Sequence, residues 1–171
     1  MEQLPLFSLL LAASWLDLST HKIPNWLTLP FILLALIYHA LLGEGLAFSL
    51  TGLVYAFLLL FPLFFFRLLA GGDVKLGLGI AAFLGWKLFL EALLYGLVIG
   101  LPLVLIFAFY KVGWTGFKQS FMRYGYILGT KQYLAPVDGE LAGLKVPYGP
   151  ALSLGAGLAV VLNHFNLFTL V

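Results

Sequence analysis

The stretch LAFSLTGLVYAFLLLFPLFFF, residues 46–66, decides the fold class of this chain. It carries no charged side chain, and it matches the roughly 20 apolar residues that a helix needs to cross a bilayer. The whole chain of 171 residues has the same character, with 63% hydrophobic residues, 9% charged residues and a mean hydropathy of +1.07. A water-soluble protein of this size has more polar surface than this composition provides. We therefore expect a membrane protein.

Further apolar segments predict an all-α, polytopic membrane protein with about six transmembrane helices. The segments cover residues 4–18, 26–42, 46–69, 76–89, 90–110 and 148–171. The fourth and fifth are hard to separate, because Lys87 and Glu91 are the only charged residues between Lys75 and Lys111. We predict a tight turn there, with a single bent helix as the alternative. The first segment lacks the basic start of a signal peptide, so we expect it to remain as a helix.

The length leaves little room for a second domain, so one transmembrane domain over residues 1–171 is expected. Six crossings place the links at 18–25, 67–75 and 111–147 on one side of the bilayer, and those at 43–45 and 85–91 on the other. Eight of the nine basic residues fall on the first side: Lys22, Arg67, Lys75, Lys111, Lys118, Arg123, Lys131 and Lys145. The positive-inside rule then makes that side cytoplasmic, in the inner (cytoplasmic) membrane.

The long link at 111–147 mixes aromatic and basic residues, which is typical of a helix lying in the membrane interface. This predicts an interfacial segment before the last transmembrane helix. The net charge of +2 is too small to indicate a nucleic-acid partner. The lipid bilayer is the expected surrounding, and the oligomeric state stays open.

Two acidic residues lie at the ends of predicted helices on the cytoplasmic side. Asp17 ends the first apolar segment, and Asp73 precedes the fourth. Each alone has an ordinary explanation, because an acid at a helix end needs no function and Asp is a common N-cap. Together they are more informative, since ionisable groups at membrane depth are costly and usually functional. The chain has only seven acidic residues in all.

A pair of neighbouring carboxyl groups supports acid–base chemistry. Two carboxylates in a site of low dielectric cannot both ionise easily, so the pair holds one proton over a range of pH. The ionised member can take a proton from water, while the protonated member polarises a peptide carbonyl and stabilises the oxyanion. Gly71 and Gly72 precede Asp73, and glycine permits close approach of a substrate strand as readily as it eases a loop. Asp17 and Asp73 are therefore candidates for the catalytic pair of an aspartic peptidase.

Three stretches together resemble the type IV prepilin peptidase family, of the small kind. They are Gly71-Gly72-Asp73-Val74-Lys75-Leu76, Asp17 with the later Ile23-Pro24-Asn25, and Val146-Pro147-Tyr148-Gly149-Pro150-Ala151. Members of that family are similar in having one aspartate before an Ile-Pro-Asn turn and a second in a Gly-x-Gly-Asp motif. The three stretches lie in the first, middle and last thirds of the chain, in the expected order.

The resemblance implies a membrane-embedded aspartic endopeptidase that cleaves the basic leader from type IV prepilins or pilin-like proteins at the cytoplasmic membrane face. It maps Asp17 and Asp73 onto the catalytic pair and gives Lys75 a supporting role, with no cofactor. The first glycine of the Gly-x-Gly-Asp motif is replaced by Ala70 here. Larger relatives carry a cysteine-bound zinc region, and many N-methylate the new amino terminus. This chain has no cysteine, so we expect neither zinc nor methyltransferase activity.

Other functions fit the same aspartates. A proton-coupled transporter or channel subunit would relay protons through them, but such proteins show repeat symmetry with interrupted helices, and the sequence has no internal repeat. A structural membrane subunit would use no chemistry, and a presenilin-like or preflagellin peptidase would differ only in substrate. We expect no metal site, because His21 lies near Asp17 whereas His39 and His164 belong to other segments.

Overall fold

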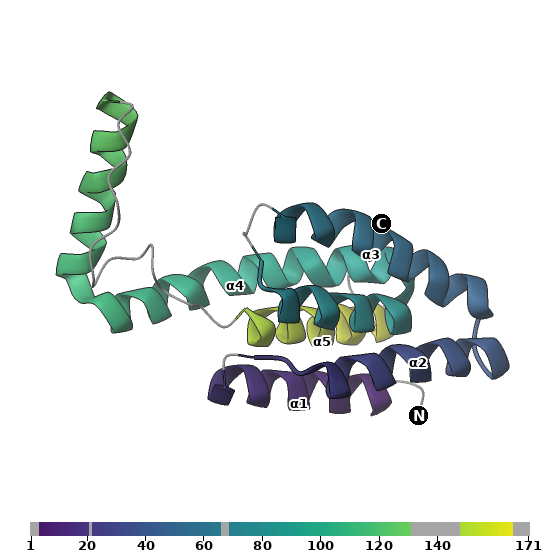
Figure 1. The fold of residues 1–171 in the computed structure, drawn as a ribbon. Helices are drawn as coiled ribbons and strands as arrows, with labels where there is room; N and C mark the ends of the chain where they lie inside the picture. Colours follow the sequence, from purple (N-terminus) through teal and green to yellow (C-terminus); the bar gives the residue numbers. More distant parts are fainter. Residues whose placement is uncertain (1–3, 21, 66–68, 131–147, 166–171) are drawn as a thin grey trace. The chain divides into compact units, whose positions relative to one another are not determined.

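The computed structural model describes residues 4–20, 22–65, 69–130 and 148–165, and over these ranges the chain is helical with no strand. Its helices are α1 (Leu4–Thr20), α2 (Asn25–Leu41), α3 (Leu46–Phe65), α4 (Gly71–Thr130) and α5 (Gly149–His164) (Figure 1). The prediction of an all-α fold is confirmed. The chain groups into two compact units, residues 1–100 with 147–171, and residues 101–146.

Two helices are long and apolar enough to cross a membrane: α3 and, within α4, residues 71–127. In the most apolar part of each, only 22% of the residues are buried inside the molecule. The core helix of a soluble protein would be mostly buried, whereas these helices expose large side chains such as Val54, Leu58 and Phe65. Helices α1 and α2 are also apolar but shorter, at 17 residues each. An apolar surface of this extent favours lipid over water as the surrounding medium.

Helix α4 joins the predicted fourth and fifth segments, and it begins at Gly71 instead of residue 76. It is not straight, because Gly85 has a φ of 70°, a left-handed conformation that favours glycine. A Cβ atom at Gly77 would lie 3.8 Å from the Phe89 ring, although twelve residues of straight helix span about 18 Å. The chain therefore turns back on itself at Gly85. The predicted tight turn is present, a few residues before the expected boundary at 89 and 90.

Small residues let the helices of the first unit approach closely. A Cβ atom at Gly155 of α5 would clash with the backbone oxygen of Ala92 and the backbone nitrogen of Gly96, both in α4. Gly52 of α3 meets the backbone oxygen of Ala81 in α4 in the same way. Close backbone contacts of this kind are typical of helices packed in membranes.

The second unit contains the rest of α4, from residue 101 to Thr130. Gly113, with a φ of 63°, interrupts the regular helix. Trp114 packs near Phe109 and Phe117, with ring centroids 6.2 and 6.4 Å away, and its side chain is 68% exposed. The predicted interfacial segment thus begins as an aromatic helix. Its remainder, residues 131–147, lies outside the described residues.

Candidate active site

Asp17 continues the buried face of α1. The buried residues of this helix are Leu6 and the residues three, four, seven and eleven positions after it: Leu9, Leu10, Ala13 and Asp17. That spacing forms one stripe along a helix, and α1 packs beside α5 (Figure 1). The Asp17 side chain is only 5% exposed. A carboxyl group thus takes the last place in an otherwise apolar stripe.

The first residue of α5 binds this carboxyl group. The backbone N–H of Gly149 donates a hydrogen bond of 2.8 Å to Asp17 Oδ2, and the bond is buried. A Cβ atom at position 149 would lie 2.7 Å from the same oxygen, so only glycine leaves room for the contact. The third stretch of the family resemblance therefore contacts the first aspartate directly, which the sequence analysis did not predict.

Asp73 lies in the first turn of α4, at the third helical position and not at the N-cap. Its Oδ2 accepts a hydrogen bond of 3.3 Å from the backbone N–H of Ala70, the residue before the helix. This is one half of a capping box. The side chain is 6% exposed, and the negative charge of Asp17 acts on it. The two candidate catalytic carboxyl groups, 56 positions apart in sequence, are thus buried and electrostatically coupled.

Two further contacts join the Ile-Pro-Asn turn to the start of α4. A Cβ atom at Gly72 would lie 3.2 Å from Ile23 Cβ. The space beside this glycine is therefore filled by the Ile-Pro-Asn turn and not left open for a substrate strand. The Lys75 ammonium group donates a hydrogen bond to Asn25 Oδ1. Gly71 has only an ordinary contact, 3.4 Å from the Phe64 ring. Gly72 and Lys75 therefore fix the turn against the helix that carries Asp73.

Tyr148 also lies in the candidate site, although the sequence analysis did not single it out. It is half-buried at the N-cap of α5, and its ring lies against Gly100. The pKa of its phenol is raised above the ordinary value, first by burial and second by the Asp73 carboxylate. Its place in the third stretch of the resemblance was the available signal. An aromatic residue at a helix start also has ordinary packing roles, so that signal was weak.

Comparison with known protein families gives one match, to the type IV leader peptidase family, over residues 4–105. The match covers more than half of the chain and includes Asp17, the Ile-Pro-Asn turn and Asp73. This chain belongs to the type IV leader peptidase family. Searches of curated proteins and of solved structures gave no significant match.

The match to the leader peptidase family ends at residue 105. It therefore does not include the third stretch of the resemblance, residues 146–151. The structure connects it to the matched part through the hydrogen bond from Gly149 to Asp17. Tyr148 and Gly149 of the third stretch therefore lie in one candidate site with Asp17 and Asp73, in the first unit. The site contains two buried carboxyl groups and a phenol, which suffice for acid–base chemistry on water and a peptide bond.

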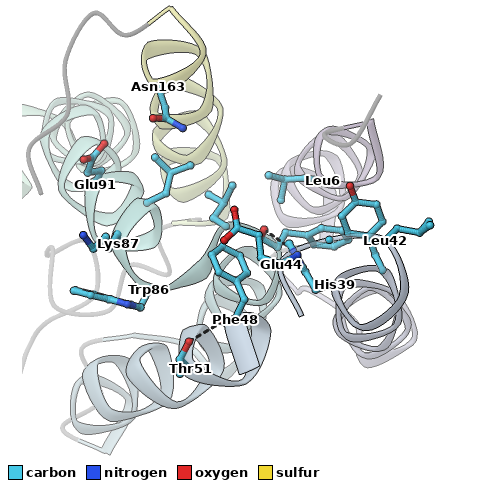
Figure 2. Close-up of a pocket in the computed structure, with 15 residues that line it drawn as sticks. Leu6, His39, Leu42, Glu44, Phe48, Thr51, Trp86, Lys87, Glu91 and Asn163 are labelled. Atoms are coloured by element: carbon cyan, nitrogen blue, oxygen red, sulfur yellow. Dashed lines mark hydrogen bonds between the residues drawn. The ribbon is translucent and has the colours of Figure 1, made fainter. Parts of the chain in front are cut away.

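A separate cavity of about 740 Å³ lies in the first unit and includes neither aspartate (Figure 2). On α1 it is lined by Leu6, eleven residues before Asp17, and on α5 by Asn163, fourteen residues after Gly149. Its polar residues include His39, whose Nδ1 accepts a 3.4 Å hydrogen bond from the Glu44 backbone N–H. On α1 and α5 the cavity therefore lies toward the ends opposite to the candidate site.

Proposed function

We propose that this leader peptidase is a membrane-embedded aspartic endopeptidase that removes the basic leader of type IV prepilins or pilin-like proteins at the cytoplasmic face of the inner membrane. The observation that carries the proposal is the burial and electrostatic coupling of Asp17 in α1 and Asp73 in α4. The Ile-Pro-Asn turn that follows α1 packs against the start of α4. Buried, interacting carboxyl groups of this kind are characteristic of sites that perform acid–base catalysis.

The proposed reaction is hydrolysis by a bound water. The ionised carboxylate of the pair accepts a proton from the water as its oxygen attacks the scissile carbonyl carbon. The protonated carboxyl group donates its proton to the carbonyl oxygen, which forms a neutral tetrahedral diol. The diol then loses a proton to the carboxylate that donated to the carbonyl oxygen as the C–N bond breaks, and the departing nitrogen takes the proton that the other carboxyl group had accepted from water, so the pair returns to its starting protonation. The products are the leader, with a new carboxyl terminus, and the mature pilin, with a new amino terminus.

The proposed topology has six crossings, in which the two arms of α4 that meet at Gly85 serve as the fourth and fifth. Lys22 and Lys75 then lie at the aspartate end of the first unit, and Lys87 lies at the end with the cavity. This sorting of basic residues supports a cytoplasmic position for Asp17 and Asp73. A prepilin whose apolar helix stays in the bilayer would present its basic leader on that same side.

Gly71, Gly72 and Lys75 have supporting roles in this proposal. Gly72 and Lys75 hold the Ile-Pro-Asn turn against α4. Gly71, whose nearest neighbour is at an ordinary distance of 3.4 Å, leaves space for an extended substrate backbone. The proposed enzyme uses no metal or other cofactor, and we expect no N-methylation of the mature amino terminus.

Co-expression with the pilin-like precursors of the same genome tests the proposal. The wild type, Asp17→Asn and Asp73→Asn are compared, and the precursor is followed by mass spectrometry. We expect the wild type alone to remove a leader, and the mature protein to carry no added methyl group. Processing by both membrane-inserted variants would refute the dyad. If a transporter or structural role were correct, no precursor would be cut by any of the three proteins.

A further inference from the structure

We propose that Asp17 is the ionised base of the pair, that Gly149 is the positioning residue that keeps it ionised, and that Asp73 is the proton donor. The catalytic meaning of this assignment rests on the proposed function. The order in which the two carboxyl groups ionise is, however, a property of the folded chain, and it can be measured without a substrate.

The hydrogen bonds of the two carboxyl groups are unequal. Asp17 Oδ2 accepts a buried bond of 2.8 Å from Gly149, whereas Asp73 Oδ2 accepts a partly buried bond of 3.3 Å from Ala70. The first distance is typical of a strong bond to a charged acceptor. The second lies beyond the usual range for N–H···O bonds. The ionised form is therefore stabilised more strongly at Asp17.

The helix dipoles partly oppose this order. Asp73 lies in the first turn of its own helix, which favours a negative charge, whereas Asp17 lies near the carbonyl end of α1. The hydroxyl groups of Ser19 and Thr20 donate hydrogen bonds to the carbonyl groups of Trp15 and Leu16, one turn before the end of α1, and the amino-terminal end of α5 lies against Asp17. A direct bond to a charged acceptor is stronger than a dipole effect at a helix end. The hydrogen bond from Gly149 therefore favours ionisation of Asp17 before Asp73.

Glycine at position 149 is a requirement of this contact. A Cβ atom there would lie 2.7 Å from Asp17 Oδ2 and 3.1 Å from Asp17 Cγ, so Gly149→Ala would push the carboxylate away from the N–H group. The same substitution at Gly157, in the same helix, would meet only the Phe7 ring, at 3.9 Å. Gly157→Ala is therefore a matched control for the effect of alanine in α5.

The titratable groups near this pair come from α4, from the residue before α5 and from the link after α1. Asp73 of α4 is electrostatically coupled to Asp17, and Tyr148, which precedes α5, is electrostatically coupled to Asp73. Lys75 of α4 binds Asn25 of α2, and His21 lies outside the described residues. The raised pKa of Tyr148 keeps its phenol neutral near pH 7. Separate signals for each aspartate are therefore needed to follow the two carboxyl groups near neutral pH.

Carbon-13 NMR of the aspartate carboxyl groups measures the order directly. The chain has only three aspartates, Asp17, Asp73 and Asp138, so selective labelling gives three signals that Asp17→Asn and Asp73→Asn assign. In the wild type, we expect the Asp17 signal to titrate at lower pH than the Asp73 signal. Gly149→Ala should move the Asp17 transition up by about one pH unit, while Gly157→Ala leaves it in place. Asp138 serves as an internal reference.

The rate profile supplies a second readout. We expect Gly149→Ala to move the acidic limb of the kcat profile to higher pH and to leave the alkaline limb, set by Asp73, unchanged. Ionisation of Asp73 before Asp17 in the wild type would overturn the proposal, even if Gly149→Ala failed to fold. An unchanged profile in a folded Gly149→Ala protein would also overturn it. If the ionisation order holds but no prepilin is cleaved, the proposed function fails and the charge assignment stands.

Discussion

At the scale of single residues, the two glycines before Asp73 differ in what surrounds them. Gly72→Ala would place a Cβ atom 3.2 Å from Ile23 Cβ and 3.3 Å from its backbone nitrogen, so the Ile-Pro-Asn turn must move. We expect kcat to fall by about tenfold or more, because small displacements in an active site are costly. Gly71 has only an ordinary contact with Phe64 but is proposed to face the substrate, so the control is Gly157→Ala, whose Cβ atom would meet only the Phe7 ring, at 3.9 Å. Equal activity of the two variants in a peptide-cleavage assay would contradict this account.

The bond between Lys75 and Asn25 predicts energetic coupling between two motifs that are 50 positions apart. A double-mutant cycle with Lys75→Ala and Asn25→Ala, followed by thermal unfolding in detergent, should give a coupling free energy of about 1 kcal/mol. Additive effects of the two substitutions would show that the contact does not stabilise the protein.

At the scale of helices, the contact between α5 and α4 should control both stability and activity. Alanine at Gly155 would meet the backbone of Ala92 and Gly96, and backbone atoms cannot rotate away as a flexible side chain can. We expect Gly155→Ala to lower the free energy of unfolding by about 1–3 kcal/mol. Activity should fall as well, because α5 begins at the residue that binds Asp17. Full stability together with full activity would show that the two helices pack differently.

The helical elements show where prediction from sequence ended. Apolar length and the lack of charge predicted the helices, and α2 and α3 begin within one residue of the expected positions. The turn at Gly85 was harder to place, because the residues on both sides of it are apolar and helix-forming. A helical pattern alone does not reveal a single residue with positive φ. The sequence analysis placed Gly71 and Gly72 in a link between helices, because glycine is common in loops. In the structure they form the first turn of α4, where Gly72 packs against Ile23.

The candidate site was also predictable only in part, because a sequence pattern shows which residues are unusual but not which helices pack together. Asp17 and Asp73 could be chosen because acids are rare in this chain and costly in a membrane. The hydrogen bond from Gly149 depends on how α5 packs against α1, and no local pattern encodes it. The proximity of Tyr148 to Asp73 has the same origin. Both follow from contacts between helices, which only a structure supplies.

At the scale of the whole molecule, the proposed topology predicts which ends of the helices face outward. The chain has no cysteine, so single cysteines can be introduced and labelled with a membrane-impermeant maleimide. We expect Glu44→Cys to react in cells whose inner membrane is intact, and Ser19→Cys to react only after that membrane is permeabilised, since the proposed topology places the aspartate end in the cytoplasm. The reverse pattern would place the peptidase site on the outer face.

Cleavage by the purified protein tests the central claim most directly. The wild type, Asp17→Asn, Asp73→Asn and Glu44→Gln are reconstituted in lipid, and the initial rate of leader removal from a synthetic prepilin peptide is measured. We predict that each aspartate variant loses at least about a hundredfold in rate, because general acid–base groups contribute on that order, and that Glu44→Gln retains wild-type activity. A folded Asp17→Asn or Asp73→Asn protein that cleaves at the wild-type rate would contradict the account.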